Sequence, residues 1–182
     1  MRGFIGRIFG FEQEIEDLKH KIRSLSWDDA FGMWTRGAFL HFCEVMPRGT
    51  RCVFFLDLTG IHELNARMGY REVDERIKRT FSIPFRSSDV IARWYSGDEV
   101  VILFDGGIDG ALRKMRELEA SACLNGLSFR YNHGFWEVGK EPIRVVVDRI
   151  AASLSRRRDS GPSPARRRRP VRDLASAPAL TE

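Results

Sequence analysis

Two adjacent carboxylates stand mid-chain in a segment that has the pattern of a hairpin. Apolar residues flank the polar centre Ser96–Glu99 on both sides, as in two strands joined by a tight turn. Gly97 has no side chain, so a ligand can approach the backbone closely there. Packing explains Asp98 and Glu99 poorly, because carboxylates are seldom buried without a partner. A solvated hairpin turn is the alternative interpretation.

A third carboxylate ends a continuous apolar run. Residues Cys52–Leu58 are apolar apart from Asp57, which indicates a buried central strand with the acid at its C-terminal end. Sheets of α/β type commonly place ligand groups at that end. Asp57 and Asp98 can converge from neighbouring strands. Oxygen ligands of this kind suit Mg²⁺, which takes one or two carboxylates and completes its shell with water and substrate phosphates.

Hydrophobic spacing predicts the elements that position these acids. Ile61, Leu64 and Met68 recur at helical spacing, and Gly69 is the expected stop. We expect helices over 31–45, 61–68, 73–83, 111–123 and 143–154, and strands over 52–58, 89–94, 100–104 and 127–136. The order α-β-α-β-β-α-β-α predicts an α+β fold in which a sheet is layered with helices.

Length and composition indicate one domain with extensions. The chain has 182 residues, and its 43% hydrophobic content with 13 phenylalanines can fill a sizeable core. No run approaches the roughly 18 apolar residues of a membrane span, and no signal-peptide pattern is present. The three cysteines have neither metal-site spacing nor an even count. They indicate reduced, mostly buried thiols, and we expect a cytoplasmic protein.

The two ends of the chain differ from the body. In residues 1–27, apolar side chains from Phe11 to Leu25 alternate spacings of four and three, a heptad seam of about two heptads. This pattern favours a coiled-coil dimer, and an amphipathic helix packed on its own domain is the alternative. In residues 156–182, eight arginines against three acids carry the whole net charge of +5. We expect this tail to be disordered. It could hold nucleic acid or anionic membrane weakly, or remain solvated without a partner.

At the hairpin the resemblance to a family becomes specific. Ser96–Val100 is similar to the signature of the GGDEF family, the diguanylate cyclases. Asp57–Asp74 matches the strand–helix segment of that family, and Asp28–Phe39 resembles its opening segment. The resemblance covers residues 28–155. It implies a palm-like, ferredoxin-related nucleotidyl cyclase domain with a central, mostly antiparallel sheet flanked by helices.

The resemblance also implies a reaction. In a homodimer, two GTP molecules condense to cyclic di-GMP, each 3′-hydroxyl attacking the α-phosphate of the other. Such chemistry needs metal ions, here Mg²⁺ or Mn²⁺, to activate the hydroxyl and neutralise charge on the phosphates. By the resemblance, Asp57, Asp98 and the Leu58 carbonyl hold the metal. Glu99 is the adjacent catalytic acid, as a metal ligand or a proton acceptor.

Other matched positions imply nucleotide contacts. Asn65 and Asp74 stand at the guanine-reading positions, where a carboxylate suits the N1–H and N2–H₂ donors of guanine. Gly97 belongs to the GTP site. Ser155 replaces the usual triphosphate-binding lysine, and Arg156 substitutes for it with an offset of one residue.

A separate product site is implied by Arg86-Ser87-Ser88-Asp89, which resembles the inhibitory RxxD site of the family. There Arg86 and Asp89 would bind cyclic di-GMP through arginine–phosphate and carboxylate–guanine contacts.

Departures from the family pattern keep other functions open. Ser96 replaces a signature glycine, Val100 replaces a phenylalanine, and one extra residue lies between Arg93 and Ser96, where it can bulge the strand. Thr59 stands where the family has a second acid. The alternative function is therefore a degenerate GGDEF domain that binds GTP or cyclic di-GMP and signals without catalysis. An interaction protein that works through its coiled coil and basic tail is a third hypothesis.

Overall fold

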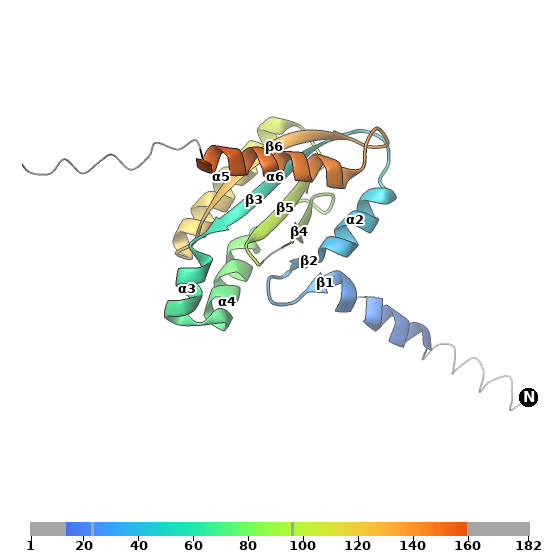
Figure 1. The fold of residues 1–182 in the computed structure, drawn as a ribbon. Coiled ribbons are helices and arrows are strands. Elements are labelled where there is room, and N and C mark those ends of the chain that lie inside the picture. The colour runs from blue at the N-terminus through green and yellow to red at the C-terminus, as the bar shows by residue number, and fades with distance from the viewer. Residues whose placement is uncertain (1–13, 23, 96, 160–182) are drawn as a thin grey trace, which may run out of the picture.

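The computed structural model of the protein describes residues 14–22, 24–95 and 97–159. Residues 14–22 and 24–26 are helical and lead into the domain (Figure 1). The elements that follow are β1 (Trp27–Asp28), β2 (Met33–Trp34), α2 (Arg36–Glu44), β3 (Thr50–Thr59), α3 (Ile61–Met68), α4 (Tyr70–Phe81), β4 (Val90–Arg93), β5 (Glu99–Phe104), α5 (Ile108–Leu124), β6 (Ser128–Glu137) and α6 (Ile143–Asp159).

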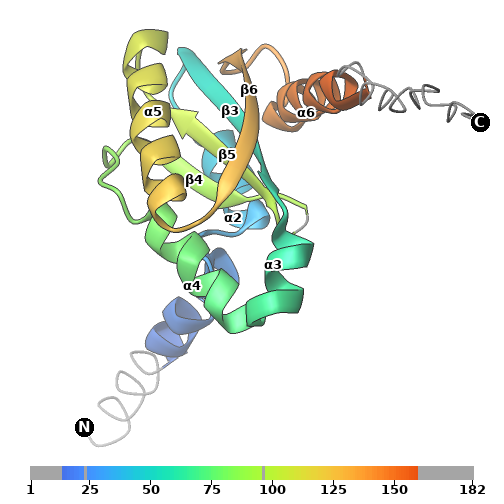
Figure 2. The ribbon, with the colours of Figure 1, turned by 90° about the vertical axis from the view of Figure 1, so that its left-hand side faces the viewer.

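One six-stranded sheet in the order β1-β2-β4-β5-β3-β6 organises the domain. All its pairs are antiparallel except β2 with β4. The long strand β3 lies between β5 and β6, and α5 and α6 cover opposite sides of the sheet (Figure 2). The predicted α+β fold with a mostly antiparallel sheet flanked by helices is confirmed.

Both faces of the central strands are buried, as the continuous apolar runs predict. Phe54 and Leu56 of β3 face the core formed with α4 and α5, whereas Val53 and Phe55 face the core formed with α2 and α6. Successive side chains of a strand point to opposite faces, so a strand covered on both sides must be apolar throughout. Asp57 is the charged residue at the end of this run, and it is only partly buried.

The first predicted helix was placed too early. Its range 31–45 is in fact a turn, the short strand β2 and then α2, which begins at Arg36. Gly32 has a φ of 67°, a conformation that ends regular helix. The Thr35 side chain accepts a hydrogen bond from the Ala38 N–H (3.4 Å) and so caps the helix where it begins.

The extra residue of the signature segment lengthens the hairpin tip and produces no bulge among the described residues of β4 and β5. The pairing runs without a slip from Val90 opposite Leu103 to Arg93 opposite Val100. The Trp94 N–H then donates to the Glu99 carbonyl (2.8 Å). β4 is therefore shorter than the predicted strand 89–94, and Tyr95, Gly97 and Asp98 lie at the tip. Ser96 lies outside the described residues.

The predictions for the two ends are tested only in part. Of the heptad positions that the structure describes, Ile15, Leu18, Ile22 and Leu25 are all exposed, Leu25 to 77%. Residues 156–159, predicted as the start of the disordered tail, are instead the last residues of α6. Phe11 and residues 160–182 lie outside the described residues, so the coiled-coil dimer and the tail contacts stay predictions. Cys43 and Cys52 are buried and Cys123 is exposed, all as free thiols. None of the described helices is long and apolar enough to cross a bilayer.

Candidate nucleotide and metal site

The pairing of β3 with β5 brings three acids to one edge of the sheet. Asp57 lies directly opposite Glu99 in the antiparallel register. One residue further, the Leu58 N–H donates to the Asp98 carbonyl (2.7 Å). The structure therefore brings together the four residues that the sequence assigned to catalysis and metal binding, from segments about forty residues apart in the chain.

Oxygen donors are available at this edge. The N–H and C=O of one strand residue point to the same side, so the Leu58 carbonyl faces the tip where its N–H meets Asp98. The Leu58 carbonyl and the Asp57 and Asp98 carboxylates are all hard oxygen donors, the type of ligand that Mg²⁺ and Mn²⁺ prefer. No group of three His, Cys, Asp or Glu side chains in the described part of the chain is arranged to hold a metal. A metal here would therefore rely on water and substrate phosphates for the rest of its shell.

The position of the second family acid contributes no carboxylate. Thr59 ends β3, and its hydroxyl lies 2.6 Å from the Ser128 hydroxyl at the start of β6. This contact ties the ends of the two strands together. The acids at this edge of the described sheet are therefore Asp57, Asp98 and Glu99.

Arg130 of β6 reaches the same site, and sequence reasoning missed it. It lies opposite Asp57 in the register of β3 and β6, and its guanidinium forms an ion pair with the Asp57 carboxylate. The Arg130 Nε atom is buried and has no hydrogen-bond partner among the described residues. A lone arginine within the predicted strand 127–136 was the available signal, but only the strand pairing shows which acid it meets.

One of the two predicted guanine-reading residues has a buried polar atom without a hydrogen-bond partner among the described residues. Asn65 is on α3 and Asp74 on α4, and the two helices pack together. The buried Oδ1 atom of Asn65 has no hydrogen-bond partner within the described chain, and such an acceptor costs free energy until a donor reaches it. Burial raises the pKa of the Asp74 carboxyl, while Arg93 lowers it and Asp28 raises it. Both groups are suited to a ligand that supplies N–H donors.

Arg93 connects the hairpin tip to the opening segment. Its guanidinium donates to the Asp28 carboxylate (2.8 Å) and lies over the Phe31 ring at 4.4 Å. A side chain at Gly97 would approach the Arg93 Nη2 atom to 3.2 Å. The absence of a side chain at Gly97 therefore keeps the tip close to this arginine and open to a ligand.

The C-terminal end of α6 approaches the same end of the sheet. The Asn132 side chain on β6 donates to the Ser153 hydroxyl on α6 (2.6 Å). Asn132 pairs with Phe55, two residues before Asp57 on β3, and Arg156 follows Ser153 by three residues. Arg156 is exposed, and its contact with the triphosphate stays a prediction.

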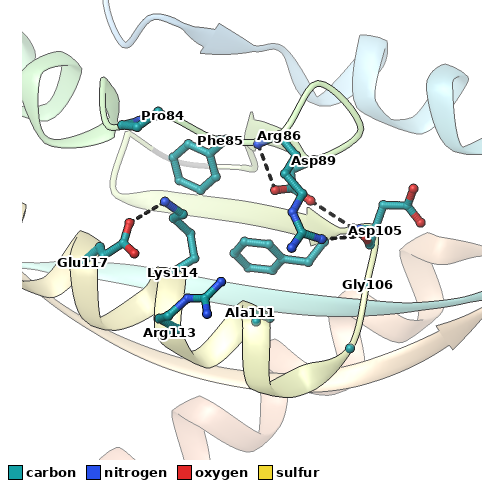
Figure 3. Close-up of a pocket in the computed structure, with 13 residues that line it drawn as sticks. Pro84, Phe85, Arg86, Asp89, Asp105, Gly106, Ala111, Arg113, Lys114 and Glu117 are labelled. Carbon is teal, nitrogen blue, oxygen red and sulfur yellow. Dashed lines mark hydrogen bonds and ion pairs between the residues drawn. The ribbon is translucent and has the colours of Figure 1, made fainter.

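The predicted product site borders a cavity of about 410 Å³ (Figure 3). The cavity lies between α5 and the loop of residues 84–89 that precedes β4. Asp89 organises this loop, because its carboxylate accepts the N–H groups of Arg86 (3.2 Å) and Asp105 (3.0 Å). Each oxygen keeps a further lone pair for a ligand. Arg86 extends over the cavity and donates to the Asp105 carbonyl (3.4 Å). Arg113 and Lys114 of α5 add two cations that sequence reasoning missed.

Replacing Asp74 by asparagine is expected to stabilise the ligand-free protein at neutral pH. The raised pKa means that the folded state binds the Asp74 proton more tightly than the unfolded chain does. The charge therefore costs no stability below the ordinary pKa of 3.8 and costs progressively more as the pH rises through the folded pKa. Urea unfolding at pH 7 should show a higher free energy of unfolding for Asp74→Asn than for the parent. At pH 3 the two proteins should have the same free energy of unfolding. Asp109→Asn, at an exposed position on α5, should show no such gain. A gain that is independent of pH would contradict the assignment.

Comparison with known proteins identifies the fold. No protein-family model matches the sequence, and no curated protein matches it significantly. Among solved structures, the coiled coil and GGDEF domain of DgcB from Caulobacter crescentus in complex with c-di-GMP is 18% identical, with a TM-score of 0.68, covering 87% of this chain and 95% of that one.

Two further GGDEF-containing structures are similar. The diguanylate cyclase SiaD from Pseudomonas aeruginosa, in complex with its activator SiaC, is 20% identical over 86% of this chain and 68% of that one, with a TM-score of 0.63. The S helix-GGDEF-EAL structure of Vibrio cholerae LapD bound to c-di-GMP is 14% identical over 82% of this chain and 38% of that one, with a TM-score of 0.61. The chain has the fold of the GGDEF domains.

Proposed function

We propose that the chain is a diguanylate cyclase that condenses two GTP molecules to cyclic di-GMP as a homodimer. The pairing of β3 with β5 carries this proposal, since it sets Asp57 opposite Glu99 and Leu58 against Asp98. Each domain offers one such edge, so joining two GTP molecules requires two edges to face each other. The exposed apolar seam that precedes the domain supports a coiled coil that holds two copies together.

The residues of the site divide the work between recognition and reaction. Asn65 and Asp74 bind the guanine edge, which supplies N–H donors to the buried Asn65 Oδ1 atom and to the Asp74 carboxylate. Asp57, Asp98 and the Leu58 carbonyl hold Mg²⁺ or Mn²⁺, which supplies activation of the 3′-hydroxyl and charge neutralisation at the phosphates. Glu99 accepts the Tyr95 N–H (3.3 Å), which fixes its carboxylate across the tip. In this position it receives the hydroxyl proton or ligates the metal.

A receptor without turnover is the second candidate, and one contact favours it. The Asp57 carboxylate is engaged by Arg130. A domain in which this pair persists would bind GTP or cyclic di-GMP through its arginines and its guanine-reading residues, and would signal through its flanking helix.

Selectivity for guanine tests the part of the proposal that both candidates share. Calorimetric titration should show that the parent binds GTP more tightly than ATP, because the adenine edge offers an acceptor where guanine offers the N1–H donor. Asn65→Ala should weaken GTP binding about fivefold, the effect of losing one neutral hydrogen bond. His62→Ala, at an exposed position on the same helix, is the matched control and should bind GTP as the parent does. Equal affinity of the parent for GTP and ATP would contradict the assignment.

Replacing Arg86 by alanine is expected to weaken cyclic di-GMP binding by roughly tenfold to a hundredfold, the usual effect of losing charge-assisted hydrogen bonds. The change leaves the loop intact, because the Arg86 backbone N–H still donates to Asp89. Arg79→Ala removes the same charge from an exposed position on α4 and is expected to have no effect. The measurement is titration with cyclic di-GMP, and unchanged affinity of Arg86→Ala would place the product site elsewhere.

A further inference from the structure

A cation already lies against the acid that is expected to bind a metal. Arg130 and Asp57 are directly opposite each other on β6 and β3, and their side chains form an ion pair. Opposite positions on antiparallel strands keep their Cβ atoms only about 5 Å apart. The strand register therefore keeps the two residues side by side, and the conformation of the Arg130 side chain decides whether the guanidinium meets the carboxylate.

The simplest alternative is that Arg130 only stabilises the sheet. Two observations point further. The side chains of Asp57 and Arg130 are 25% and 37% exposed, and ion pairs at this depth stabilise little. The buried Arg130 Nε atom also lacks a hydrogen-bond partner among the described residues, so the guanidinium is only partly satisfied by Asp57. An arginine in this state can bind a second anion without first losing all its existing contacts.

We infer that Arg130 and a divalent cation compete for Asp57, so that Arg130 holds the carboxylate whenever the site contains no nucleotide. This inference rests on the proposed function. The guanidinium remains charged at any accessible pH, so it cannot relieve its repulsion from a metal ion by losing a proton. A metal can bind Asp57 only when the guanidinium moves away.

Nucleotide phosphates provide the place to which Arg130 moves. The planar guanidinium fork matches a phosphate as well as it matches a carboxylate. Arriving GTP would give Arg130 a new partner and release Asp57 at the same moment. Arg130 thereby makes strong divalent-cation binding conditional on the presence of the nucleotide, which is a positioning and regulatory role.

The test is Mn²⁺ binding to the nucleotide-free, full-length protein, followed by electron paramagnetic resonance. Arg130→Gln should bind Mn²⁺ roughly fivefold more tightly than the parent, the fold-change that corresponds to one partly exposed ion pair. Arg149→Gln is the matched control, because it removes the same charge and breaks the ion pair that Arg149 of α6 forms with Glu141 (2.6 Å). This control variant should bind Mn²⁺ as the parent does. Equal gains in both variants would assign the effect to net charge and overturn the inference.

A double variant shows whether the gain acts through Asp57. Adding Asp57→Asn to Arg130→Gln should abolish the tighter Mn²⁺ binding, and retention of the gain would overturn the inference. Unchanged Mn²⁺ affinity in a folded Arg130→Gln protein, verified by circular dichroism, would overturn it too. GTP binding by the parent, measured in parallel, separates the two hypotheses. A parent that binds no GTP contradicts the proposed function, whereas a parent that binds GTP beside an unaltered Arg130→Gln contradicts only the competition.

Discussion

Replacing Asp98 by alanine is expected to lower cyclic di-GMP synthesis by about a thousandfold, because loss of a metal-facing carboxylate removes several kcal/mol of transition-state stabilisation. The tip itself should persist, since it is the backbone carbonyl of Asp98 that accepts the Leu58 N–H. The residues on α3 and α4 that we propose to read guanine are also untouched. The measurement is the initial rate of cyclic di-GMP formation from GTP in the presence of Mg²⁺, with the product quantified by chromatography.

The control for this variant is Asp109→Ala, which removes a carboxylate from an exposed position in the first turn of α5. It should keep the parental rate. Titration of Asp98→Ala with GTP should show that the nucleotide is still bound, so that the loss lies in the reaction and not in binding. A variant that retains a tenth or more of the parental rate would remove Asp98 from the catalytic set.

Replacing Phe54 by alanine is expected to have the largest effect on stability, a loss of about 3–5 kcal/mol in the free energy of unfolding. Phe54 is fully buried at the centre of β3. Its ring stacks on His133 (5.0 Å between centroids) and meets Phe104 edge-on (5.3 Å). Alanine would leave a cavity between three strands, and the packed surroundings can close it only in part.

Phe135→Ala provides the comparison for this prediction. Phe135 lies on the neighbouring strand β6 and is 56% exposed, so its loss should cost less than about 1 kcal/mol. Urea unfolding followed by circular dichroism measures both. Since single domains are stable by about 5–15 kcal/mol, the Phe54 variant should unfold at a clearly lower urea concentration. Equal midpoints for the two variants would contradict the assignment of Phe54 to the core.

Local patterns predicted the central strands and most helices correctly. The apolar run ending at Asp57 reports burial on both faces of the sheet, because every position of such a strand is covered. Val100–Phe104 has the same property, and the structure extends it by one residue to Glu99. The stop at Gly69 was predicted as well, and it separates α3 from α4 with a φ of 84°. Each of these elements could be predicted because the residues that indicate it belong to the element itself or directly adjoin it.

Features that depend on pairing between distant segments could not be predicted. Arg130 and Asp57 are 73 residues apart, and their contact follows from the register of β3 with β6, which no local pattern encodes. The short strands β1 and β2 hold two residues each, too few for a periodic signal.

Lys114 belongs to a charged helix whose pattern does not reveal that its side chain borders a cavity. The metal and nucleotide roles came from the resemblance to a family, and the structure contributes the geometry in which they can be tested.

The most direct test is product formation by the 182-residue chain. The purified chain is incubated with GTP and Mg²⁺, and the products are separated by chromatography. The proposed function predicts that cyclic di-GMP accumulates with time and that the reaction stops when the divalent cation is chelated. A folded protein that binds GTP and forms no cyclic di-GMP would contradict the cyclase and leave the nucleotide receptor as the function of this domain.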